Sequence, residues 1–130
     1  MAAVSSVAVK GPKVTVEWAV DSRERMPALE FFKTLERDDR LKVIVLFKRL
    51  AEAGEIASRE QFKNLGRSTG GLWEFKRFQL RFLGDYRPGG RFIVALGVRK
   101  KRDDLNPSDI EKAIRILAEH DEREKRIAKK

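Results

Sequence analysis

The chain has 130 residues, and hydrophobic residues make up 42% of them, which fits one globular domain and argues against a disordered protein. There is no cysteine, so disulfides, iron–sulfur clusters and thiolate-bound zinc are excluded. The formal net charge is +9, and no apolar run is long enough to cross a bilayer.

The positive charge is concentrated in the middle third of the chain. Residues 59–102 hold twelve Lys and Arg against three Asp and Glu, whereas residues 1–58 hold ten against nine and residues 103–130 seven against eight. Solubilising charge is usually mixed in sign and spread over the surface. A segment of one sign attracts polyanions. The sequence therefore favours RNA or DNA as a partner over an anionic membrane, because this segment contains no basic amphipathic helix.

The first elements predicted along the chain are a strand and two helices. Residues 1–12 have no compact apolar core after a basic start, so we expect a flexible tail and no signal peptide. Residues 13–20 (KVTVEWAV) alternate with period two, which predicts a half-buried strand. Residues 27–37 and 40–53 carry apolar side chains at helical spacing, and Gly54 is a typical stop for the second helix. Two helices this close together form an αα-hairpin.

After a polar connector, the alternation returns and predicts three more strands, over 72–78, 80–86 and 91–98. The stretch RPGG between the last two is typical of a hairpin turn. A final helix begins after Asn106, and we expect residues 121–130 beyond it to form a flexible tail. The order β-α-α-β-β-β-α predicts one α+β domain over residues 1–130: a small antiparallel sheet with helices on one face.

The pleat of the strand at 72–78 decides which of its side chains share a face. Trp73 and Phe75 point to one side, which we interpret as the core, whereas Glu74 and Lys76 point outward beside Arg81 of the next strand. A basic, partly aromatic sheet face is suited to single-stranded nucleic acid. The alternative is that these are ordinary solvent-facing residues of a sheet exposed on one side.

The last predicted strand ends in four consecutive cations, within GVRKKRDD (97–104). Such a cluster can clamp phosphates, form an ordinary charged surface, or guard a strand end against aggregation. The sequence leaves these three interpretations open.

Conventional catalytic arrangements are scarce. The single histidine, His120, lies late in the final helix among acids, and we expect it on the surface, favoured there by the helix C-terminus. A Ser-His-Asp or Cys-His pairing is not expected from a chain with one histidine and no cysteine. Asp103 and Asp104 are adjacent carboxylates facing a basic patch, which makes a poor magnesium site. We therefore do not expect this pair to bind a metal ion.

Several stretches occur in an order and spacing that resemble a known family. They are Lys63-x-Leu65, GLWE (71–74), Arg81, GGRFIVALGVRKK (89–101) and NP-x-DIEKAI (106–114). Together they resemble the RelE/HigB superfamily of type II toxins, and most of all its phage-derived RelE-like branch. The resemblance covers about residues 13–118 and implies a small antiparallel sheet backed by helices.

The resemblance also implies an activity and two partners. Members cleave mRNA in the ribosomal A site through attack of a 2′-hydroxyl on the adjacent phosphorus, without a metal or cofactor. A cognate antitoxin with a helix-turn-helix domain holds such a toxin inactive. The expected location is the cytoplasm.

By the same resemblance, individual cations receive roles. Arg81 matches the family's sheet arginine, which clamps the scissile phosphate in bidentate fashion. Lys76 matches a strand lysine that stabilises developing charge or acts as a base, and Lys100 lies in the basic strand end near the leaving group. These three are the expected catalytic residues. Expected RNA contacts are Lys63, Arg77, Arg87, Arg99, Lys101 and Arg102.

The sequence departs from the family pattern in two places. Leu105 and Asn106 stand where members often carry a tyrosine or histidine, and Glu74 stands where some carry a second strand lysine. Three other functions therefore stay open: a catalytically silent RNA-binding module, a gyrase-poisoning relative of the same fold, and a protein-binding accessory factor that uses the αα-hairpin.

Overall fold

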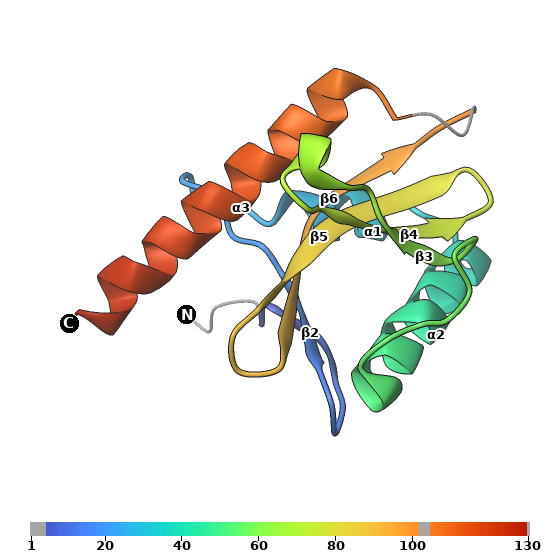
Figure 1. Ribbon diagram of the computed structural model, residues 1–130, viewed down its shortest axis with the longest axis horizontal. Coiled ribbons are helices and arrows are strands. Elements are labelled where there is room, and N and C mark those ends of the chain that lie inside the picture. The colour runs from blue at the N-terminus through green and yellow to red at the C-terminus, as the bar shows by residue number, and fades with distance from the viewer. Residues whose placement is uncertain (1–4, 102–104, 130) are drawn as a thin grey trace.

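The computed structural model describes residues 5–101 and 105–129, and these form one mixed sheet with helices on both sides (Figure 1). Within the described residues, the strands are β1 (Val7–Lys10), β2 (Thr15–Trp18), β3 (Phe62–Asn64), β4 (Trp73–Arg77), β5 (Leu80–Arg87) and β6 (Arg91–Arg99). The helices are α1 (Pro27–Lys33), α2 (Arg37–Ala53) and α3 (Pro107–Ala128), with a short 3-10 turn, η1 (Arg67–Thr69). The α+β class is thus as predicted.

The sheet differs from the prediction in its edges and in one pairing. Its order is β1-β2-β6-β5-β4-β3, so each edge carries a strand that was not predicted. Both edge strands are too short, at four and three residues, to show a clear alternation. Strands β2 and β6 pair in parallel, which corrects the expectation of an antiparallel sheet. Parallel neighbours need a long crossover, and the chain between β2 and β6 supplies it.

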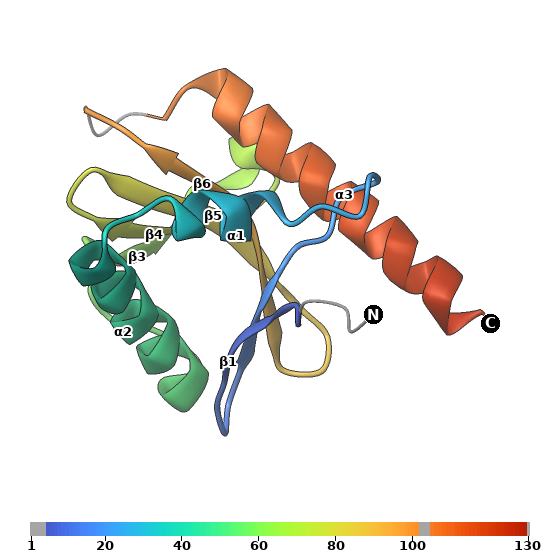
Figure 2. The same ribbon diagram turned by 180° about the vertical axis from the view of Figure 1, so that it is seen from behind.

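Helices cover both faces of the sheet, which corrects the prediction that they pack on one face. Helices α1 and α2 lie on the side seen in Figure 2, and α3 crosses the side seen in Figure 1. The cause is visible in β6, where Phe92 to Gly97 are all buried. A strand buried on both faces carries a continuous apolar run instead of an alternating one.

An aromatic core fills the space between the sheet and α2. Phe47 of α2 contacts Phe75 edge-on, with ring centroids 4.8 Å apart, and it also contacts Trp18 and Phe82. The predicted core side of β4, with Trp73 and Phe75, is confirmed. Tilted and edge-on pairs of this kind add specificity to apolar burial.

The α2–β3 connection begins with a helix stop that the sequence predicts well. Gly54 caps α2 with a φ of 82°, and its N–H donates to the carbonyl oxygen of Leu50 over 2.7 Å. That left-handed conformation is comfortable for glycine. The Tyr86 hydroxyl donates to the carbonyl oxygen of Gly54 over 2.9 Å and ties the helix end to β5.

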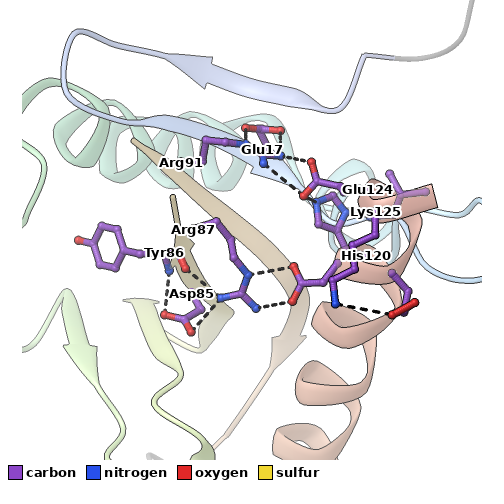
Figure 3. A network of polar contacts seen from close by, with 11 residues as sticks. Glu17, Asp85, Tyr86, Arg87, Arg91, His120, Glu124 and Lys125 are labelled. Carbon is purple, nitrogen blue, oxygen red and sulfur yellow. Dashed lines mark hydrogen bonds and ion pairs between the residues drawn. The ribbon is translucent and has the colours of Figure 1, made fainter. Parts of the chain in front are cut away.

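Helix α3 is attached to the sheet in two different ways along its length. Its first half packs apolar side chains, among them Ile116 and Leu117, against β5 and β6. Its second half is held by ion pairs (Figure 3). Arg87 of β5 grips Asp121 through two hydrogen bonds of 3.0 Å each, and Arg91 of β6 joins Glu124 of α3 to Glu17 of β2. The predicted tail from residue 121 is therefore helical to Ala128.

His120 is buried beside these ion pairs and does not lie on the surface, which corrects the sequence-based expectation. Its side chain is 3% exposed. Its Nδ1 accepts a hydrogen bond of 3.0 Å from the Val20 N–H, and its Nε2 lies 3.2 Å from Glu124 Oε1. Burial lowers the pKa of His120 below its ordinary value, because the charged form is poorly solvated there.

We expect acid to weaken the fold through His120. In the unfolded chain the imidazole takes up a proton near pH 6.5, whereas in the folded protein it does so only at lower pH. The contribution of His120 to the free energy of unfolding is therefore complete above about pH 6.5. Below that pH it is lost by up to about 1.4 kcal/mol per pH unit, until the lower pKa of the folded protein is reached. Urea unfolding at pH 7.5 and pH 5 measures the loss.

A matched variant isolates the contribution of the histidine. His120→Gln keeps a hydrogen-bond acceptor for the Val20 N–H but does not titrate. We expect its stability to change less between the two pH values than that of the wild-type protein. An identical pH dependence of the two proteins would rule out His120 as the source.

Candidate functional site

Four of the predicted cations gather on the α3 side of the sheet, at one end of β4, β5 and β6. We call Lys63, Lys76, Arg81 and Lys100 the cationic cluster. Lys76 and Arg81 are direct cross-strand partners, and Lys63 is the partner of Glu74, two residues before Lys76. Directly opposed residues of antiparallel strands share a face. In Figure 1, α3 runs along one side of this face and leaves β3 and β4 uncovered by a helix.

Lys100 reaches the same region from the end of β6. Arg81 is paired with Val98, and Lys100 lies two residues further along, so it follows the same face. Its backbone N–H donates to the carbonyl oxygen of Gln79 over 2.7 Å. Its ammonium forms an ion pair with Asp109 in the first turn of α3. Asp109 thus holds Lys100 at the edge of the cluster.

Arg81 lies beneath the surface of the cluster. Only 2% of it is exposed, and its Nη1 donates to the carbonyl oxygens of Phe78 and Leu80. Its Nε lies 3.8 Å from a carboxylate oxygen of Glu74, which is equally buried. The guanidinium therefore fixes the β4–β5 turn and carries a permanent charge under the open face.

The burial of Glu74 corrects the expectation that it faces solvent. Its direction was predicted correctly, since it shares a side with Lys63 and Lys76. That side is nevertheless covered at its position, since only 2% of Glu74 is exposed. A buried carboxylate needs a cationic partner, and Arg81 lies close enough to serve as one.

The remaining predicted cations lie outside the cationic cluster. Arg77 points to the α2 side, with its guanidinium carbon 4.3 Å from the ring centroid of Phe78. Arg87 is at the opposite end of β5 in the ion pairs with Asp85 and Asp121. Arg99 and Lys101 are exposed at the end of β6. Arg102, Asp103 and Asp104 lie outside the described residues.

The contacts of two further residues near these cations were not predicted. Asp109 is an acid in the first turn of α3, and its position after the basic strand end could have suggested a pair with that segment. Phe78 occupies the β4–β5 turn with a φ of 51° and is 68% exposed. Only residues 78 and 79 connect β4 to β5, and a two-residue turn between paired strands requires such a backbone conformation. The shortness of this connection is the feature of the sequence that could have placed Phe78 in the turn.

Two other classes of site are absent from the part of the chain that the structure describes. Over residues 5–101 and 105–129, there is no group of three or more His, Asp and Glu side chains able to hold a metal ion. None of the helices described there combines the length and the apolar character that crossing a bilayer requires.

One comparison with known proteins identifies the family of the chain. None of the curated proteins matches the sequence. A family model described as "Phage derived protein Gp49-like (DUF891)" matches residues 30–118, a stretch that runs from α1 into α3 and includes the whole cationic cluster. More than half of the chain is covered. The chain therefore belongs to the phage-derived Gp49-like family, a toxin-like family related to RelE/HigB-type toxins.

Proposed function

We propose that the protein is the toxin of a type II toxin–antitoxin system and cleaves mRNA in the ribosomal A site. The observation that carries the proposal is the cationic cluster, in which Lys63, Lys76 and Arg81 come from three different strands and share one face. A phosphodiester that lies across this face meets fixed positive charge on several sides. Its work on the ribosome makes the cytoplasm the expected location.

The proposed chemistry is transesterification within the RNA. The 2′-hydroxyl attacks the adjacent phosphorus while the bond from phosphorus to the 5′-oxygen breaks. The products are a 2′,3′-cyclic phosphate and a 5′-hydroxyl, so the proton lost by the 2′-hydroxyl is balanced by the one that the leaving oxygen gains. Negative charge grows on the phosphorane oxygens in the transition state, and preorganised cations stabilise it selectively.

The geometry supports distinct roles within the cluster. Lys63 and Lys76 are partly exposed and are the side chains that can touch a phosphate directly. Arg81 is 2% exposed, so we assign it a role from beneath, where it positions the turn and adds positive potential, in place of the direct bidentate clamp implied by the family resemblance. Lys100, held by Asp109, adds charge near the leaving oxygen.

Induced expression followed by primer extension tests the proposal. We expect growth arrest and cuts within translated mRNA, and with purified components we expect cleavage only when ribosomes are present. A protein that binds RNA with strong salt dependence and yields no cuts on the ribosome would contradict it.

One observation favours a second candidate, the catalytically silent RNA-binding module. Arg81 is buried and Lys100 is ion-paired, so both of these expected catalytic residues are engaged within the protein. Such a module would keep RNA affinity without cleavage, and the same primer extension separates the two. For either function, the toxin-like family implies a cognate antitoxin, and we propose that it carries a helix-turn-helix domain.

A further inference from the structure

A groove lies on the opposite side of the sheet from the cationic cluster, between α2 and the strands at the β3 edge. We call it the α2 groove, and its volume is about 160 Å³. It is lined by Lys42, Val45, Leu46, Arg49, Gln61 and Arg77. Three of these six side chains are cationic and none is acidic.

The cations of the α2 groove have few acidic or hydrogen-bonding partners in the described part of the protein. Arg49 donates a hydrogen bond of 3.0 Å to the neutral side chain of Gln61. The Nε of Arg77 is buried and has no hydrogen-bond acceptor in the described part of the chain. A buried donor without an acceptor is costly. The groove is therefore short of oxygen acceptors and of negative charge.

The groove also presents apolar surface. Val45 is 47% exposed, and Leu41, one turn earlier on the same stripe of α2, is 53% exposed. Phe78 is 68% exposed, and the centroid of its ring lies 5.5 Å from Lys42 Nζ and 4.3 Å from the guanidinium carbon of Arg77. An aromatic residue with positive φ is strained, and here the strain displays a bulky apolar side chain beside two cations.

We propose that the α2 groove is the docking site of an acidic amphipathic segment of the cognate antitoxin. Carboxylates of that segment pair with Lys42, Arg49 and Arg77, and its apolar side chains cover Val45 and Phe78. This inference rests on the proposed function for the identity of the partner. Charge complementarity selects an acidic occupant, and the aliphatic surface of Leu41 and Val45 favours a protein segment over RNA, which uses aromatic and guanidinium planes.

An antitoxin segment bound in the α2 groove does not cover the cationic cluster, which lies on the other side of the sheet. Groove variants are therefore expected to keep mRNA cleavage while they escape neutralisation by the antitoxin. Phe78→Asn removes the aromatic anchor and should fold, because asparagine adopts positive φ more readily than phenylalanine does. Lys42→Glu/Arg49→Glu reverses two groove charges. The matched control is Arg126→Glu/Lys129→Glu, two exposed cations at the end of α3.

The experiment is calorimetric titration of each purified variant with the purified cognate antitoxin, with growth assays in parallel. We expect each groove variant to bind roughly 30-fold more weakly, the effect of losing an interface hot spot, and the control to bind as the wild type does. Wild-type affinity in both groove variants would overturn the proposal. Loss of mRNA cleavage with unchanged antitoxin affinity would identify the groove as an RNA surface and overturn it too.

Two further measurements distinguish a failure of the proposed function from a failure of this inference. If the wild-type protein is not toxic but its antitoxin affinity depends on the groove, the proposed nuclease function fails and this inference stands. Overlapping 15-residue peptides that tile the antitoxin test the chemistry of the occupant. We expect the tightest-binding peptide to carry Asp or Glu beside apolar residues and to lose affinity when its Glu residues become Gln, whereas a neutral or basic best binder would contradict the inference.

Discussion

Lys76→Met is expected to lower the rate of ribosome-dependent mRNA cleavage by about 10²–10³-fold, the usual effect of removing one preorganised charge that stabilises a transition state. Lys76 is the partly exposed member of the Lys76–Arg81 cross-strand pair, so its ammonium is the cation that can reach a phosphate on the open face. Methionine keeps most of the apolar stem, and we expect the fold to be unchanged. Primer extension under single-turnover conditions measures the rate.

Lys76→Arg is the matched control for this prediction, because it keeps the positive charge at the same position. It should retain much more activity than the methionine variant. Cleavage by Lys76→Met within threefold of the wild-type rate would remove Lys76 from the site. Equal melting temperatures of the three proteins would show that the comparison concerns chemistry and not folding.

Arg81→Met is expected to cost about 3–5 kcal/mol of folding stability, the range found when one partner of a buried ion pair is removed. The change leaves the buried Glu74 carboxylate without the guanidinium that now lies 3.8 Å away. It also removes the donor to the carbonyl oxygens of Phe78 and Leu80 in the β4–β5 turn. Urea unfolding monitored by circular dichroism measures the loss.

A double variant tests the cause of that loss. Glu74→Gln/Arg81→Met removes both charges, so it should be less destabilised than the sum of the two single variants. A loss below about 1 kcal/mol for Arg81→Met alone would show that the guanidinium is not part of the structural core, and would return it to the direct phosphate contact implied by the family resemblance.

Most of the secondary structure could be predicted because its signals are local. Strand-like patterns of apolar residues located β2, β4, β5 and β6, and prolines and glycines marked several ends, as Gly54 does for α2. The parallel β2–β6 pairing could not be predicted in this way. It depends on where the chain returns after α1, α2 and the β3–β5 strands, which is a property of the whole fold.

The candidate site was predictable only in part, because charge in the sequence is not the same as free charge in the folded protein. Cross-strand register was accessible, and the neighbouring positions of Lys76 and Arg81 follow from it. The partners of the other cations come from distant segments: Asp121, 34 positions away, engages Arg87. Local alternation cannot reveal such a pair. Arg87, Arg91 and Lys100 of the positive middle third are thereby used to hold α3.

Charge reversal in the cationic cluster and charge reversal in the α2 groove are expected to have opposite effects on mRNA cleavage, so one measurement tests the central claim. Lys63→Glu/Lys76→Glu reverses charges on the open face of the cationic cluster, and Lys42→Glu/Arg49→Glu makes the same reversal in the α2 groove across the sheet. The measurement is the rate of mRNA cleavage on purified ribosomes for both proteins. We expect the first variant to be inactive and the second to cleave at the wild-type rate, whereas full activity of the first would contradict the assignment of the catalytic face.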